Sequence, residues 1–128
     1  MAITKNAGRQ NILAAEVTFN GGTDVTSTGT YEAIDLPVGA LICGAQYEVL
    51  DTFTGTGTVA VQVGAAVLLA ANNGDAAGVT TAAEGDIDVP TLTATDTVDV
   101  VVATAALTDG QAKVVVFYTI ADRATEAQ

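Results

Sequence analysis

The sequence contains no histidine and no tryptophan. Without histidine, the chain lacks the commonest general base, the Ser–His relay and the usual side-chain ligand of transition metals. It also lacks GxxxxGK(S/T) and GxGxxG motifs, so no phosphate-binding loop is indicated. A glycosidase would need two carboxylates at a defined separation in a cleft, usually with aromatic sugar platforms, and the absence of tryptophan weakens that case. We therefore expect no enzymatic activity, no catalytic residue, no bound cofactor and no metal ion.

Cysteine is nearly absent, because Cys43 is the only one and no disulfide can form within the chain. This fits folding in a reducing compartment such as a cytoplasm. Cys43 belongs to the apolar series of a predicted strand, and no base lies nearby in the sequence, so we expect a core or sheet cysteine and not a nucleophile. The first residues lack a secretory apolar core, and the longest apolar run, near residues 63–71, is far shorter than the ~20 residues of a spanning helix. These features predict a soluble chain that does not enter a membrane.

Positive charge is also scarce. Four basic residues stand against 15 acidic ones, and the formal net charge of −11 argues against binding to nucleic-acid phosphates. Lys5 and Arg9 both lie in residues 1–11, which show no periodicity. We predict that this segment is a short extended arm, either frayed or reaching onto an acidic neighbour. Arg123 follows the last predicted strand, where it either pairs with an acidic residue close by in the sequence or forms an ion pair with another subunit.

Residues 41–64 show the clearest periodicity in the chain. β-Branched residues and glycines are abundant, which favours strands and turns over helices. Apolar side chains in this stretch occupy odd positions on both sides of a glycine-containing turn, a pattern that predicts a hairpin with one buried face. A three-residue loop at residues 55–57 would place Phe53 opposite Val59 and keep that face apolar on both strands.

Other runs predict further strands at residues 12–19, 31–36, 87–93, 97–103 and 112–120. Residues 65–71 fit either a helical turn or a buried strand, and residues 76–85 resemble a loop.

The last predicted strand, residues 112–120, is apolar on both faces, with Val115 and Phe117 on the side opposite Val114 and Val116. Such a strand is either central in a sandwich or packed against another subunit. The whole pattern of short strands and turns predicts an all-β fold, an antiparallel β-sandwich of which a jelly roll is one form, with a short extended N-terminal arm. The expected organisation is an arm at residues 1–11 and a single β-sandwich domain at residues 12–128.

Glu84, Asp86 and Asp88 alternate along the chain, so their carboxylates can share a face. Together with Asp96 or Asp99 they could in principle surround a calcium ion with oxygen ligands. Their spacing matches no calcium-binding loop. We interpret them as solvated turn carboxylates and predict no metal site.

Three groups of residues resemble a family of small virion proteins of tailed bacteriophages, found also in prophages. They are residues 36–40 (LPVGA) with 52–53 (TF) and 61–64 (VQVG); residues 68–71 (LLAA) with 77–80 (AGVT); and the ending, residues 114–126 (VVVFYTIADRATE). The resemblance covers most of the chain after about residue 30.

This resemblance implies a capsid decoration (cement) protein. Such a protein is a β-sandwich, often oligomeric, that sits on the outside of the virion head and braces contacts between major capsid protein subunits. The expected partners are the major capsid protein and further copies of the chain, as a trimer first and a dimer as the alternative, with synthesis in the host cytoplasm. The expected interface residues are Lys5, Arg9, Val115, Phe117 and Arg123.

Two other classes stay open at this point. A phage tail or fibre component with a carbohydrate- or receptor-binding β-sandwich would be favoured if Tyr31, Tyr47 and Tyr118 clustered at the surface. An acidic hydrolase would require a cleft with two facing carboxylates.

Overall fold

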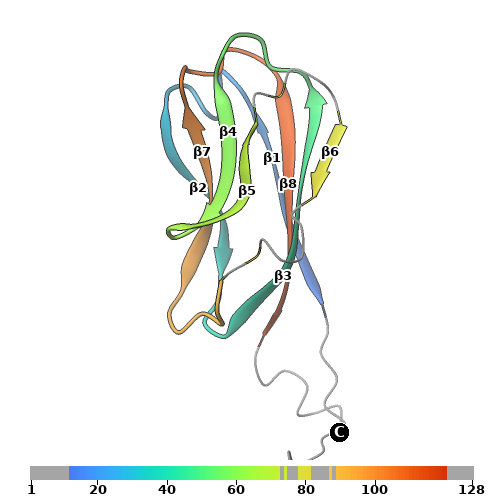
Figure 1. Cartoon of the computed structure of the whole chain (residues 1–128), viewed down its shortest axis with the longest axis vertical. Helices are drawn as coiled ribbons and strands as arrows, with labels where there is room; N and C mark the ends of the chain where they lie inside the picture. The colour runs from blue at the N-terminus through green and yellow to red at the C-terminus, as the bar shows by residue number, and fades with distance from the viewer. Residues whose placement is uncertain (1–11, 73, 75–77, 82–86, 88, 121–128) are drawn as a thin grey trace, which may run out of the picture.

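Two four-stranded antiparallel sheets form a sandwich in the computed structural model, which describes residues 12–72, 74, 78–81, 87 and 89–120 (Figure 1). The strands are β1 (Leu13–Asn20), β2 (Gly29–Leu36), β3 (Ala40–Asp51), β4 (Thr58–Val63), β5 (Ala66–Asn72), β6 (Gly78–Thr81), β7 (Asp96–Ala103) and β8 (Gln111–Ile120). These described residues form no helix, and so no helix that could cross a membrane. The predicted all-β antiparallel sandwich is confirmed, whereas the predicted arm, residues 1–11, lies outside the described residues.

The strand pairs are nested within one another. The first sheet has the order β1-β8-β3-β6 and the second sheet has the order β2-β7-β4-β5. β1 therefore pairs with β8, β2 with β7, β3 with β6 and β4 with β5. Only the β4–β5 connection stays within one sheet, and every other connection passes from one sheet to the other.

The inner faces of the two sheets supply the core. Val59, Val61 and Val63 of β4 are buried, as their alternation predicted. In β8, Val114 and Val116 are fully buried, while β8 itself lies between β1 and β3. Of the two roles predicted for this doubly apolar strand, the structure shows the central position in a sheet.

The predicted hairpin over residues 41–64 is wrong. β3 pairs with β8 and β6 in the first sheet, whereas β4 pairs with β5 and β7 in the second, so the turn is a crossover between sheets. Both strands direct one face into the same core, and a crossover therefore needs the same alternation as a hairpin. The pattern located the two strands correctly but did not determine which strand pairs with which.

Cys43 lies in a sheet strand, which is one of the two predicted alternatives, but its side chain is exposed and not on the buried face where the alternation placed it. A β-bulge causes this change, because Ile42 pairs with Tyr118 while Gly44 already pairs with the preceding residue, Phe117. The extra residue shifts the inward positions of β3 from even numbers before the bulge to odd numbers after it. Leu41 is exposed for the same reason.

In two segments the structure differs from the predicted elements, and in a third it decides between two predicted alternatives. The described part of residues 87–93 forms no strand, although Leu92 still exchanges hydrogen bonds with the backbone of Gly39 and Ala40 at 2.8 and 2.9 Å. β6 lies inside the predicted loop at residues 76–85, and it is a strand of only four residues with no buried position. Residues 65–71 fall largely in β5, which decides between a strand and a helical turn.

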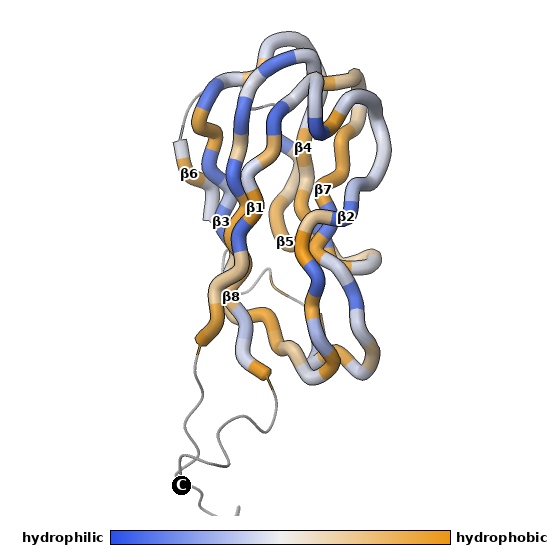
Figure 2. Tube along the Cα trace, turned by 180° about the vertical axis from the view of Figure 1, so that it is seen from behind, coloured by the Kyte–Doolittle hydropathy of each residue, from blue (hydrophilic) through white to orange (hydrophobic). Residues whose placement is uncertain are grey.

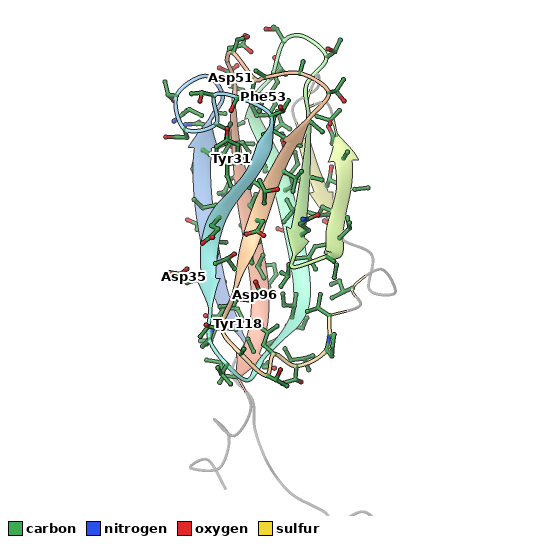
Figure 3. The ribbon with its side chains drawn as sticks, turned by 90° about the vertical axis from the view of Figure 1, so that its left-hand side faces the viewer. Tyr31, Asp35, Asp51, Phe53, Asp96 and Tyr118 are labelled. Atoms are coloured by element: carbon green, nitrogen blue, oxygen red, sulfur yellow. The ribbon has the colours of Figure 1, made fainter. Side chains whose placement is uncertain are left out.

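Phe53 fixes the crossover between β3 and β4 at one end of the sandwich (Figure 3). Its amide donates a 2.9 Å hydrogen bond to the carbonyl of Gly74, and its ring stacks on Phe19 with a centroid separation of 6.3 Å. Gly74 and Gly110 lie against the two sides of the ring, where a Cβ on either would overlap its atoms. Both glycines have positive φ (64° and 91°), so a larger residue would be strained there for two reasons.

Asp109 accepts hydrogen bonds from Thr54, the residue that follows Phe53. We expect the contribution of Asp109 to the stability of the fold to depend on pH. The amide and hydroxyl of Thr54 donate hydrogen bonds of 2.9 and 2.8 Å to its carboxylate, which lowers the pKa of Asp109. The folded-state pKa therefore lies below the unfolded value of about 3.9, so the stabilisation is present above that value and is lost as the pH falls through the folded-state pKa. Asp109→Asn should lower the melting temperature at neutral pH, and its difference from wild type should shrink in acid. Thr54→Val, which removes only the hydroxyl bond, should show a smaller effect, and a difference that does not change with pH would contradict this account.

Tyr47 presents a buried hydroxyl with no hydrogen-bond partner among the described residues. The side chain is 3% exposed, and burial raises the pKa of this phenol above its usual range. Because removing an unpaired buried polar group is neutral or favourable, Tyr47→Phe should leave the free energy of unfolding unchanged or raise it by up to about 1 kcal/mol. Tyr31→Phe is the matched control, since the Tyr31 hydroxyl donates to the Ser27 carbonyl and accepts from the Ser27 amide, and that variant should be less stable than wild type. Chemical denaturation of both variants measures this, and destabilisation by Tyr47→Phe would indicate that the hydroxyl has a partner.

Candidate interaction surface

The outer face of the first sheet carries the two described members of the predicted interface. Val115 lies between Glu16 of β1 and Gln46 of β3, and both Val115 and Phe117 are half-buried. The structure thus brings these two side chains together on one face, as the sequence predicted. The other three predicted interface residues, Lys5, Arg9 and Arg123, lie outside the described residues.

Phe117 covers Gly44 across the sheet. A Cβ placed on Gly44 would lie 3.2 Å from Cδ2 of the Phe117 ring, so the ring occupies the space above the glycine. An aromatic side chain packed over a cross-strand glycine compensates for the missing side chain of the glycine. Part of the Phe117 surface is therefore used within its own sheet, and only the remainder is available to a partner.

An apolar patch continues from Phe117 to the end of the sheet where β1 begins and β8 ends. We call it the terminal patch. Ile12 is 66% exposed and Leu41 is 43% exposed, and Leu41 stands opposite Thr119. Figure 2 shows the hydrophobic colour continuing to these ends of β1 and β8. The patch consists of Ile12, Ala14, Leu41, Cys43 and Phe117. Contiguous exposed apolar residues of this kind make the terminal patch a candidate interaction surface.

Charge on this face lies farther along the sheet. Lys113 is the one basic residue among those the structure describes, and its Nζ is 3.6 Å from Oε1 of Glu48. Both side chains are about one-third exposed, so this pair contributes little to stability. The terminal patch itself is uncharged.

The outer face of the second sheet is acidic. Glu32 stands directly opposite Asp99, and Asp35 follows on the same face opposite Thr97. Like charges placed directly across a strand pair repel each other, and the Thr97 hydroxyl donates a 2.6 Å hydrogen bond to Asp99. The two sheets therefore present chemically different outer surfaces, one apolar toward its end and the other negative.

A groove of about 680 Å³ borders this acidic face and is lined in part by Glu32, Asp35 and Asp96. Asp96 pairs with the buried Leu36 and so belongs to the inner face, whereas Asp35 belongs to the outer face. The register thus places these two carboxylates on opposite faces of the sheet, and the groove does not aim them at a common point (Figure 3).

The acidic residues that the sequence suggested as calcium ligands are only partly visible. Glu84, Asp86 and Asp88 lie outside the described residues. Within the described ranges, no group of three or more histidine, cysteine, aspartate or glutamate residues is placed to hold a metal ion. Asp96 and Asp99 instead accept hydrogen bonds from Thr97.

The three tyrosines do not form a surface cluster. Tyr47 is buried, Tyr31 lies toward one end of the sandwich and Tyr118 toward the other (Figure 3). The feature that would favour a carbohydrate-binding module is therefore not present in these residues.

Comparison with known proteins identifies the fold. No protein-family model and no curated protein sequence matches the chain. Three solved structures do match: the capsid of Ralstonia phage GP4 (20% identity, 94% of this chain and 90% of that chain, TM-score 0.61), the capsid asymmetric unit of cyanophage Pam1 (23%, 94% and 91%, 0.62), and the acid-stable capsid of Helicobacter pylori bacteriophage KHP30 (18%, 88% and 94%, 0.56). This chain shares its fold with chains of three phage capsids. Because each match spans nearly all of both chains, the phage capsid chains are about as long as this one.

Sequence reasoning missed Ile12, Leu41 and Cys43 as members of the exposed patch. It placed Leu41 and Cys43 on a buried face because it assumed an uninterrupted alternation along the strand. Gly44 was the available signal, since a glycine inside a strand pattern suggests a bulge or a close approach of another chain segment.

We expect Cys43 to react quickly with a thiol reagent in the folded protein, because the side chain is exposed on the outer face of the first sheet. Titration of the free protein with Ellman's reagent should modify one thiol per chain without denaturant. The same titration in denaturant is the control and gives the total thiol content. Reaction only after unfolding would show that the thiol is covered and that the bulge is absent or that the patch is occupied.

Proposed function

We propose that this chain is a bacteriophage capsid decoration (cement) protein. In this role it binds the outside of the virion head, contacts the major capsid protein and stabilises contacts between its subunits. The role is structural and not catalytic. It combines the family resemblance of the sequence with the fold that the chain shares with phage capsid chains.

The single observation that carries the proposal is the match in length as well as in fold. The alignments cover 90%, 91% and 94% of the three phage capsid chains, so no large additional domain of those chains is left unmatched. A small sandwich of this size is suited to sitting on a shell and bridging its subunits. The proposed role therefore belongs to the whole chain, because nearly the whole chain matches the phage capsid chains.

The two outer faces suggest how such a protein would be oriented. We assign the outer face of the first sheet, with Val115, Phe117 and the terminal patch, to the contact with the major capsid protein. Apolar residues exposed together gain most when they are buried in an interface. The acidic face of the second sheet, with Glu32, Asp35 and Asp99, would then face solvent, where negative charge opposes adhesion to nucleic acid.

We also propose that the sandwich is a jelly roll. The nested pairs make the chain equivalent to one long hairpin with its tip at β4–β5, folded so that its strands alternate between two sheets. Eight strands in two such sheets are the number and arrangement that a jelly roll requires.

Binding to particles tests the proposal. Purified protein is incubated with virions of the phage that encodes it, lacking the endogenous copy, and the particles are imaged at high resolution. We expect density for the chain at symmetric positions on the outside of the head. Density on the tail or fibre, or the absence of binding, would contradict a decoration role.

A matched pair of variants tests the assigned face. Val115→Asn changes a half-buried valine on the outer face of the first sheet, and Val101→Asn changes its counterpart on β7 of the second sheet. We expect Val115→Asn to weaken particle binding by roughly tenfold or more, about 1.4 kcal/mol, with little effect from Val101→Asn. Circular dichroism confirms that both variants fold. Equal losses for the two variants would show that the first sheet is not the contact face.

A further inference from the structure

β1 is the least protected of the four edge strands. β2 carries a bulge between Glu32 and Ile34, β5 carries two register shifts against β4, and β6 has only four residues. Bulges, charges and short length are the usual means of preventing an edge strand from pairing with another chain. β1 pairs with β8 over eight residues with no register shift, and Glu16 is its one charged residue. Its other edge is therefore suited to accept a further strand.

Hydrogen bonds at the end of β1 identify which backbone groups face this edge. The amide of Gly21 donates to the carbonyl of Gly110, in the same register as the β1–β8 pairs, so odd-numbered residues bond toward β8. The amide of Asn20 instead donates to Asp24, and its carbonyl accepts from the amides of Asp24 and Val25, so Asn20 bonds away from β8.

Antiparallel strands alternate in this way at every residue. The backbone N–H and C=O groups of Ala14, Glu16 and Thr18 therefore point away from β8. Within the described residues, none of these groups has a backbone partner outside the strand ladder. Asn20 is capped by its own loop, which leaves three residues as the open edge.

A slot of about 280 Å³ lies beside this edge. Its walls include three consecutive residues of β1 (17–19) and three consecutive residues of β2 (31–33), so it runs between the edges of the two sheets and not over one face. Val25 and Val100 contribute apolar surface, and the other lining residues include two acids, Asp24 and Glu32. The slot therefore suits a side chain with an aliphatic stem and a positively charged end.

We propose that residues 1–11 of a second copy of this chain add to the edge of β1 as an extra strand. Lys5 and Arg9 are four residues apart, so both point to the same face of an extended segment, and they are half of the basic residues in the chain. Eleven extended residues span roughly 36 Å, more than the distance along Ala14–Thr18. Strand addition supplies the backbone hydrogen bonds, and the slot supplies apolar contact and negative charge for a basic side chain.

The donor is assigned to another copy because of where the arm joins the sandwich. Residues 1–11 run directly into β1, so an arm pairing with its own β1 would have to reverse direction beside Ile12. An arm from a neighbouring copy can approach the edge without such a turn. Donation from each copy to the next is a head-to-tail contact, and such contacts form a ring, for example a trimer, when the rotation between copies closes.

Thr18→Pro tests the edge directly. Proline removes the outward N–H of residue 18, while the β1–β8 hydrogen bonds, made by odd-numbered residues, stay in place. Thr18→Val is the matched control, because it changes the side chain and keeps the N–H. Sedimentation of the free full-length protein should show an oligomer for wild type and Thr18→Val, and association at least tenfold weaker for Thr18→Pro. A monomeric wild type, or a folded Thr18→Pro protein that associates as wild type does, would overturn the proposal.

Disulfide trapping tests whether the strand added to β1 comes from a second copy. It also tests the proposal if the Thr18→Pro variant fails to fold. In a Cys43→Ala background, one tagged copy carries Thr18→Cys and a second, untagged copy carries one cysteine placed in turn at positions 3–9. After mixing and oxidation, we expect crosslinks between the two copies at alternate arm positions, as in a strand. No crosslink at any position would overturn the proposal. A chain carrying both cysteines that crosslinks only within itself would assign the edge to its own arm and would overturn it equally.

This proposal concerns the free protein, and it does not depend on the proposed capsid function. Oligomer formation without binding to particles would support the strand exchange and contradict the decoration role. Binding of monomers to particles would support the decoration role and contradict the strand exchange.

Discussion

The packing of Phe53 between two glycines is the contact on which the arrangement of the two sheets depends. The ring lies where the chain passes from β3 to β4, with Gly74 and Gly110 on its sides and Phe19 stacked against it. These residues come from the connections after β3, β5 and β7 and from the end of β1. One side chain therefore ties together segments of both sheets, and the Thr54–Asp109 hydrogen bonds hold the next residue in place. This packing adds to the β3–β8 and β4–β7 pairings, which keep β3 and β4 in different sheets.

The sequence predicted the fold class and most strands because period-two alternation reports burial directly. Val59, Val61 and Val63 point inward whether their neighbour is β3 or β7, so the alternation located the strand but could not identify its partners. The errors at Leu41 and Cys43 have a different origin. One extra residue at the bulge reverses the inward positions of the first part of β3, and alternation read along the chain cannot show where such a residue is inserted. Val115 and Phe117 were placed correctly on the face opposite Val114 and Val116, because β8 contains no such shift in its pairing with β1.

The two sheets share a core but differ in what they present outward. The first sheet offers apolar residues toward one end, with Glu16 and the Lys113–Glu48 ion pair farther along, while the second offers carboxylates at Glu32, Asp35 and Asp99. With a net charge of −11 the chain is repelled by other acidic surfaces, and the apolar end of the first sheet is the part of its described surface where burial would offset that repulsion. Because of this asymmetry, the two outer faces of the described sandwich are not equivalent as contact surfaces.

The nesting of the strand pairs has a consequence for synthesis. β8 is the last of the described strands, yet it occupies a central position between β1 and β3. While the chain is still emerging from the ribosome, β1 and most of β3 therefore have no strand beside them to complete the first sheet. The nascent protein must carry these unpaired strands until β8 has been synthesised, and chains truncated before β8 would expose them to aggregation.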